Sequence, residues 1–330
     1  MTKHMRLGRG VAAGLIAAGM ALGTTAAHAQ EPVRIAYGDV ISVEALNLLI
    51  ALEGAKERGV EVEFIEFQGE DIANEAVLGG QADIGVGTPY AVIQRSGAPI
   101  RMFYQLSALR FFPVANKEVY PDWASLDGGT FGVHTRGSGT EAMARLIEQT
   151  EGIAFGELSY VPGSDVRSLA LIQGNLDAAF VDAAGRSLVM NEDPEKFIEL
   201  PVPDVNATDE ALFARIDWLE ENQETVQIIV EELLKTWRKI NEDPAFVAAE
   251  RERLGLAPDL PDDLVAEITP YFEGSVASNV FPDDGGGANV AAADFAFYTI
   301  AGQLEGEPSE LNAEDFWYNA PLEAALSAVQ

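Results

Sequence analysis

The chain has no cysteine and only three histidines. Without cysteine it can form no disulfide, hold no metal through a thiolate and use no cysteine nucleophile. Two of the histidines, His4 and His28, lie near the N-terminus, in a segment that we expect to be removed. Only His134 would then remain, which excludes a metal site or a catalytic apparatus that needs several histidines.

Basic residues are also few. The chain holds 21 Lys and Arg against 53 Asp and Glu, a formal charge of −32. Such a surface repels phosphate backbones, so we expect no nucleic-acid partner. The 330 residues are enough for about two domains at roughly 150 residues each. An apolar content of 48% is ordinary for a chain with a large core.

Residues 1–29 have the pattern of a secretory signal peptide. Lys3, Arg6 and Arg9 precede a short apolar stretch, and Ala27-His28-Ala29 provides a small-residue cleavage site. We expect cleavage after Ala29 and export to the periplasm. The mature chain would keep 18 basic and 53 acidic residues, a formal charge of −35. No later apolar run is long enough to span a membrane, so we expect no membrane insertion.

The first half of the mature chain alternates short apolar strands with helices. This βαβα order predicts an α/β fold with mostly parallel sheets and helices on both faces. The strands are expected at Val33 to Ala36, Val60 to Phe67, Ile84 to Val86 and Ile100 to Leu106, with helices at Val43 to Arg58, Asp71 to Leu78 and from Gly87 to about Gly97.

The same alternation restarts after the turn at Leu126 to Gly129. From Glu220 onward apolar residues recur every three or four positions, which predicts a helical C-terminal region. In this second run strands are expected at Thr130 to Val133, Leu158 to Val161, Ala178 to Val181 and Phe197 to Leu200, with helices after Gly137-Ser138-Gly139-Thr140, at Asp165 to Gln173 and at Ala184 to Met190.

One short pattern occurs in both runs. Gly80-Gln81-Ala82-Asp83 and Gly174-Asn175-Leu176-Asp177 each stand between a predicted helix and an apolar strand. Each glycine can end its helix in the left-handed conformation. G-x-x-D is a common connection of this kind, but its place in two matching runs predicts two similar lobes.

The layout resembles the type II periplasmic solute-binding proteins of ABC importers. It is most similar to their nitrate, sulfonate and taurine branch, which also holds binders of thiamine-pyrimidine precursors. The stretches that carry the resemblance are Gly80 to Gly87, Gly97 to Ile100, Leu126 to Gly128, Gly137 to Gly139, Gly174 to Ala179 and Trp218 to Asn222, in family order.

The resemblance implies two α/β lobes joined by two crossover strands, closing on a ligand by hinge motion. Residues 30–114 and 215–330 would form lobe 1, and residues 115–214 would form lobe 2. The crossovers would fall near Pro113 to Asn116 and Leu212 to Asp217.

Loops beyond the carboxyl ends of strands are where such folds bind ligands. The candidate ligand-binding residues lie in four such loops and beside the first crossover. They are Gly38, Asp39, Val40, Gly87, Thr88, Pro89, Arg110, His134, Thr135, Arg136, Gly137, Ser138, Gly139, Thr140 and Asp182. The segment from His134 to Thr140 combines hydroxyls, glycines and an arginine at a helix N-terminus, which suits an anion.

Several of these residues have an ordinary structural alternative. Ser138 or Thr140 could simply cap the helix, the aspartates could form turns, and His134 could be a buried structural residue. If Arg136 and one aspartate both face the ligand, a zwitterion such as taurine fits. If only Asp39 and Asp182 face it, a cationic heterocycle fits better.

The sequence therefore predicts an exported, monomeric solute-binding protein that captures a small organic anion or zwitterion of the sulfonate or taurine type. It would deliver this solute to the permease and ATPase subunits of an ABC importer. Two alternatives stay open: a binder of a cationic or neutral heterocycle resembling a pyrimidine precursor, and a sensory receptor that signals to a kinase. We expect no enzymatic activity, cofactor or metal site, since one histidine and no cysteine leave few catalytic groups.

Overall fold

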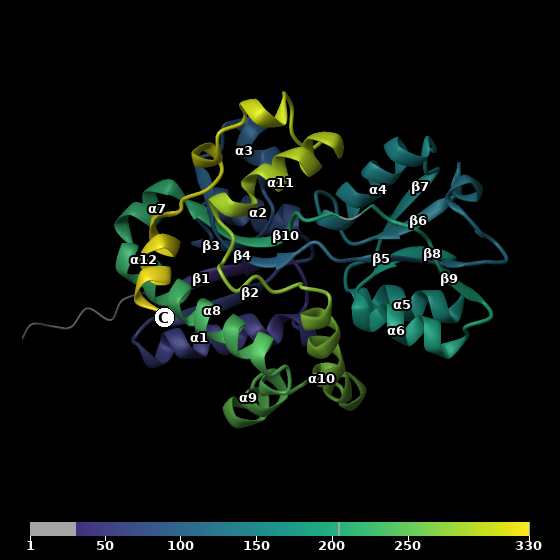
Figure 1. Ribbon diagram of the computed structural model, residues 1–330. Coiled ribbons are helices and arrows are strands. Elements are labelled where there is room, and N and C mark those ends of the chain that lie inside the picture. Colours follow the sequence, from purple (N-terminus) through teal and green to yellow (C-terminus); the bar gives the residue numbers. More distant parts are fainter. Residues whose placement is uncertain (1–30, 204, 330) are drawn as a thin grey trace, which may run out of the picture. The chain divides into compact units, whose positions relative to one another are not determined.

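A computed structural model of the chain describes residues 31–203 and 205–329. The predicted signal peptide lies outside the described residues. From Pro32 onward the chain forms one compact unit that contains two five-stranded sheets (Figure 1).

The first sheet has the strand order β2-β1-β3-β10-β4. Its strands are β1 (Val33–Tyr37), β2 (Val62–Glu66), β3 (Ile84–Gly87), β4 (Ile100–Ala108) and β10 (Thr208–Arg215). β1 runs parallel to β2 and β3, and β10 runs antiparallel to β3 and β4.

The second sheet repeats this arrangement with the order β7-β6-β8-β5-β9. Its strands are β5 (Phe112–Asn116), β6 (Thr130–Val133), β7 (Glu157–Tyr160), β8 (Ala178–Val181) and β9 (Phe197–Glu199). β5 is the antiparallel strand here, pairing with β8 and β9. The predicted two-lobed α/β fold with mostly parallel sheets is confirmed, with one antiparallel strand in each described sheet.

The antiparallel strand is in each case the first strand after the chain changes sheets. The chain leaves the first sheet between Ala108 and Phe112 and returns between Glu199 and Thr208. Both segments expected as crossovers were therefore placed too late in the sequence. Pro113 to Asn116 lies within β5, and Leu212 to Arg215 lies within β10, because both segments hydrogen-bond into a sheet.

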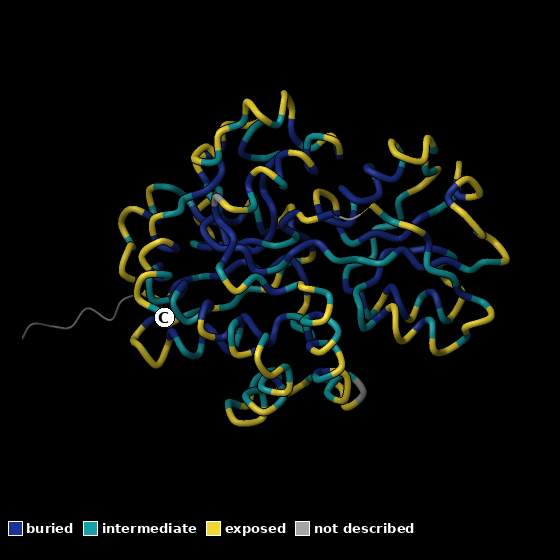
Figure 2. Tube along the Cα trace, in the orientation of Figure 1, coloured by how far each residue is buried: buried dark blue, intermediate teal, exposed yellow. Residues whose placement is uncertain are grey.

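Helices cover both faces of each sheet (Figures 1 and 2). They are α1 (Leu46–Glu57), α2 (Glu70–Leu78), α3 (Tyr90–Ser96), α4 (Gly139–Glu151), α5 (Ser164–Gln173), α6 (Ala183–Glu192), α7 (Ile216–Glu221), α8 (Gln223–Glu242), α9 (Phe246–Leu254), α10 (Asp262–Ala277), α11 (Ala288–Ile300) and α12 (Ala320–Ala328). Short 3₁₀ turns are η1 (Val43–Ala45), η2 (Trp123–Leu126), η3 (Pro308–Glu310) and η4 (Ala313–Asp315). None of the described helices combines the length and apolarity needed to cross a membrane.

Alternate residues of each central strand point to opposite cores. In β10, Ala211 and Phe213 join the core that contains α2, α3 and α11, whereas Leu212 and Ala214 join the core beneath α1 and α8. All four are fully buried. The middle of β10, Ala211 to Ala214, is therefore a continuous apolar run, as expected where a strand is covered on both faces.

The two G-x-x-D connections adopt the predicted conformation. Gly80 and Gly174 end their helices with φ of 72° and 74°, in the left-handed region. Each aspartate then fastens the next strand to a neighbour. Asp83 pairs with Arg34 of β1 at 2.7 Å, and Asp177 accepts a hydrogen bond from Asn116 of β5 at 3.1 Å.

Candidate functional site

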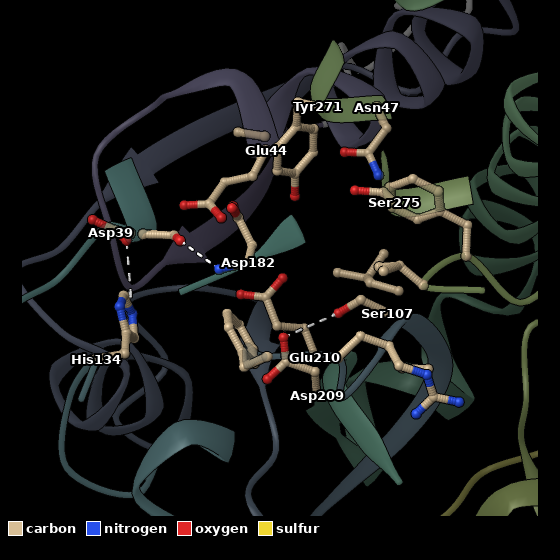
Figure 3. Close-up of a pocket in the computed structure, with 18 of the residues that line it drawn as sticks. Asp39, Glu44, Asn47, Ser107, His134, Asp182, Asp209, Glu210, Tyr271 and Ser275 are labelled. Carbon is tan, nitrogen blue, oxygen red and sulfur yellow. Dashed lines mark hydrogen bonds and ion pairs between the residues drawn. The ribbon is translucent and has the colours of Figure 1, made fainter. Parts of the chain in front are cut away.

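A pocket lies beyond the carboxyl ends of β1, β6 and β8 and beside the first residues of β10. We call it the cleft pocket (Figure 3). Its charged and histidine side chains are Asp39, Glu44, Glu70, Arg110, His134, Arg167, Asp182, Asp209 and Glu210. They come from both sheets and from η1, so the pocket depends on the whole fold rather than on one loop.

Six carboxyl groups dominate the cleft pocket. The pKa values of all six are raised, with burial as the largest cause. Burial and the nearby Glu44 raise the pKa of Asp209 to about 7, and burial together with Asp209 raises that of Glu210 to about 8. At neutral pH, Asp209 and Glu210 are therefore at least partly protonated. Bound protons, rather than a positively charged side chain, offset part of the acidity of the site.

His134 follows β6 and faces two of these acids. Its Nδ1 accepts a hydrogen bond from the Gly163 amide at 3.3 Å, which places the proton of the neutral ring on Nε2. Nε2 approaches Asp39 at 3.7 Å and Glu70 at 3.9 Å. Burial, with a smaller effect of Arg167, lowers the pKa of His134 to about 3. The ring therefore adds no positive charge at neutral pH.

Arg167 is the buried cation of the site, with 1% of its surface exposed. It lies on α5, and its guanidinium donates to the carbonyls of Phe180 and Val161 at 2.7 and 2.8 Å. Burial lowers its pKa, and the nearby acids Glu44 and Asp182 act in the opposite direction. Arg167 and the less buried Arg110 are the two arginines that line the cleft pocket, against six carboxyl groups.

The segment expected to bind an anion uses its donors internally. Arg136 is exposed and stacks over the ring of Tyr160 at 4.9 Å, outside the cleft pocket. The Gly137 amide donates to Oε2 of Glu141 at 2.7 Å. Ser138 caps α4 by accepting from the Glu141 amide at 3.3 Å. The helix N-terminus thus already holds an acid from its own chain, and Ser138 caps the helix, while its predicted ligand contact stays a prediction.

Six of the predicted residues line the cleft pocket, namely Asp39, Arg110, His134, Ser138, Thr140 and Asp182. The others do not line it: Gly38, Val40, Gly87, Thr88, Pro89, Thr135, Arg136, Gly137 and Gly139. Thr88 and Thr135 are buried, while Val40 is 61% exposed. Asp182 also caps α6, because its Oδ1 accepts from the Gly185 amide at 2.6 Å.

Arg110 is fixed to the segments that join the sheets. Its guanidinium donates to the carbonyls of Leu109 and Val205, to Oδ1 of Asn206 and to the carbonyl of Ser278. These partners include residues of both passages between the sheets. Arg110 thus holds the two passages together, and its predicted contact with the ligand stays a prediction.

Five charged lining residues were missed, namely Glu44, Glu70, Arg167, Asp209 and Glu210. Glu70 follows β2 closely, so the rule that ligands lie beyond strand ends could have found it. Asp209 and Glu210 lie at the start of β10, which begins before the crossover strand that was expected near Leu212 to Asp217. Within residues 31–203 and 205–329, no three His, Cys, Asp or Glu side chains are arranged to hold a metal ion.

Comparison with solved structures defines the class of fold. A ligand-binding component of an ABC-type import system from Staphylococcus aureus, with zinc bound, has a TM-score of 0.66 at 15% identity, covering 90% of this chain and 99% of that one. The nitrate-binding protein NrtA of Synechocystis PCC 6803 has a TM-score of 0.66 at 12% identity, covering 91% and 89%. The alkanesulfonate-binding protein SsuA of Xanthomonas axonopodis pv. citri, bound to MOPS, has a TM-score of 0.61 at 16% identity, covering 83% and 94%.

These likenesses show the two-lobed fold of periplasmic binding proteins. The family model described as NMT1/THI5 like matches residues 55–246, more than half of the chain, and the chain belongs to this family. The resemblance drawn from the sequence is thereby confirmed. Comparison with curated proteins gives no match.

Proposed function

We propose that the chain is a periplasmic solute-binding protein that delivers its ligand to an ABC importer. The support is the family, the fold, and a pocket built from both sheets at their carboxyl ends. Such a protein works by closing on a ligand and docking on a permease with its ATPase, without chemistry on the solute. Nothing in the comparisons favours the sensory alternative, so we propose transport.

We further propose that the solute is an organic cation. The observation that carries this proposal is the set of six carboxyl groups in the cleft pocket, against a neutral histidine and two arginines, Arg110 and Arg167, that backbone carbonyls hold. Figure 3 shows Asp39, Glu44, Asp182 and Glu210 around the same space. A cation entering that space gains charge-assisted hydrogen bonds, whereas a sulfonate or nitrate would meet several carboxylates at short range.

The zwitterion prediction depended on Arg136 facing the ligand. Arg136 is exposed on Tyr160 outside the pocket, while Asp39 and Asp182 both line it. This is the arrangement for which the sequence analysis preferred a cationic heterocycle. We therefore propose a positively charged solute in place of a sulfonate or taurine.

A thermal-shift screen of the mature chain, residues 30–330, tests the proposal. A ligand that binds only the folded state raises the melting temperature. We expect a rise with alkylamines, diamines or N-methylpyridinium, and none with ethanesulfonate, taurine or nitrate. A rise confined to the anions would contradict the proposal.

Isosteric variants make the screen specific. Glu44→Gln and Glu210→Gln each remove an acid that can ionise against a bound cation, with little change of shape, and each should weaken cation binding about 10-fold or more. Glu57→Gln, at an exposed position of α1, is the matched control and should leave binding unchanged. If all three variants bind the cation equally well, the cleft pocket is not the ligand site.

A further inference from the structure

A second hollow adjoins the cleft pocket, between α10 and η1 on one side and α5 and α6 on the other. We call it the side pocket. Both pockets are lined by the same four residues, Glu44, Ser164, Asp182 and Tyr271. The two pockets therefore adjoin along these four residues.

The side pocket has apolar walls and an acidic rim. Val43, Leu188 and Leu264 supply aliphatic side chains, and Leu188 is 41% exposed although it is a large apolar residue. Asp165 and Glu267 bring carboxylates to the same lining. The side pocket thus combines aliphatic and acidic side chains in one lining.

The eight carboxyl groups of the two pockets fall into three groups. Asp39, Glu70, Asp209 and Glu210 line only the cleft pocket, Glu44 and Asp182 line the shared boundary, and Asp165 and Glu267 line only the side pocket. A single compact charge can contact one of these groups. A chain of separated charges can contact all three, with its methylene groups against the aliphatic walls.

Glu70 adds an acid at the cleft-pocket end of this series. It lines the cleft pocket with 8% of its surface exposed, and Nε2 of His134 lies 3.9 Å from its Oε1. A bound ammonium group can donate to this carboxyl group and stabilise its ionised form.

We propose that the solute is a linear polyamine, with ammonium groups separated by short methylene segments, that extends from the cleft pocket past Glu44 and Asp182 into the side pocket. This inference rests on the proposed function, because it requires that the protein binds a cation. It narrows the solute from any organic cation to an elongated one with several charges.

Isothermal titration calorimetry of the mature chain with a graded set of amines tests the inference. The probes are n-butylamine, 1,4-diaminobutane, spermidine and the compact cation N-methylpyridinium. We expect the dissociation constant to fall about 10-fold or more with each added ammonium group. If n-butylamine or N-methylpyridinium binds as tightly as spermidine, the polyamine inference fails and the proposed cation receptor stands. If no cation binds, both fail.

Variants of the side pocket test where the polyamine lies. Glu267→Gln alone, and together with Asp165→Asn, should weaken spermidine binding about 10-fold and leave 1,4-diaminobutane unchanged. Glu273→Gln, exposed on the same helix α10 and outside both pockets, is the control. If the binding of neither ligand weakens, or if both weaken equally, the side pocket does not hold part of the solute. Unfolding midpoints of the free variants verify that each one is folded.

Discussion

The amide of Gly137 donates a hydrogen bond to Oε2 of Glu141 at 2.7 Å, across the first turn of α4. The other oxygen of this carboxylate accepts from the Tyr160 hydroxyl at 2.7 Å. Together with the positive end of the helix, these donors satisfy an acid that belongs to the chain. The part of the molecule best suited to bind an external anion is thus already occupied.

The first prediction concerns this internal anion. Glu141→Ala should lower the free energy of unfolding by about 1–2 kcal/mol, because it removes charge-assisted hydrogen bonds and a favourable interaction with the helix dipole. Urea denaturation measures the change. Glu151→Ala, exposed at the end of the same helix, is the control and should change stability by less than about 0.5 kcal/mol. Equal effects would show that Glu141 is an ordinary surface residue.

The second prediction concerns the arginine that joins the two passages between the sheets. Arg110→Lys keeps the charge, but one ammonium group cannot reach Val205, Asn206 and Ser278 together. We expect a loss of about 2–3 kcal/mol in the free energy of unfolding, measured in urea. Arg253→Lys, at an exposed pair with Glu250, should cost less than about 0.5 kcal/mol. A similar cost at both positions would rule out the special role of Arg110.

Local signals were enough to predict most of the fold. The glycines that end helices, such as Gly80 and Gly174, and the short apolar runs between them mark the alternation of helix and strand. The antiparallel strands β5 and β10 were harder to predict. Their pairing joins residues far apart in the sequence, for example Phe213 with Gly85, and no local pattern encodes such a register.

The site was predictable where its residues follow strands. Asp39, His134 and Asp182 come within two residues of the ends of β1, β6 and β8, and all three line the cleft pocket. Arg136 follows β6 in the same loop as His134, yet its side chain turns outward to Tyr160. Sequence position places a backbone at the edge of a sheet, but the direction of the side chain depends on which donors the neighbouring turn already uses.

The third prediction concerns pH. Asp209 and Glu210 have folded pKa values of about 7 and 8, above the value of about 4 in an unfolded chain. The folded state therefore binds more protons, and stability falls as pH rises toward 8. His134, with its pKa lowered to about 3, acts in the opposite direction, but only below about pH 6.5. Of these three groups, only Asp209 and Glu210 contribute to the change of stability between pH 6.5 and 8.5.

Thermal unfolding of the ligand-free chain across that interval should show a falling melting temperature. Each excess proton bound by the folded state corresponds to about 1.4 kcal/mol per pH unit at full effect. Glu210→Gln should flatten the profile and should be more stable than the wild type at pH 8.5. Glu57→Gln removes the same charge from an exposed position and separates this effect from general repulsion. Parallel profiles for the two variants would disprove the assignment.

The fourth prediction concerns a buried carboxylate beside the start of β10. Asp294 is fully buried and accepts hydrogen bonds from the amide and hydroxyl of Thr208 at 2.6 and 2.8 Å, and from the Tyr90 hydroxyl at 2.5 Å. Trp317 in turn donates to the Tyr90 oxygen at 2.9 Å. The network fixes Thr208, the residue that immediately precedes the two acids of the cleft pocket.

Asp294→Asn replaces one accepting oxygen with an amide that cannot accept, so at least one buried donor must change its partner. We expect a loss of about 2–4 kcal/mol in urea denaturation. Burial raises the pKa of Asp294 to about 6, so protonation of the folded wild type begins near that pH. Ionisation of this buried carboxyl group lowers the free energy of unfolding as pH rises from about 4 to 6. The stability of Asp294→Asn should therefore depend less on pH in that range. Asp315→Asn, exposed in η4, should change neither quantity. If the two variants behave alike, Asp294 does not organise the start of β10.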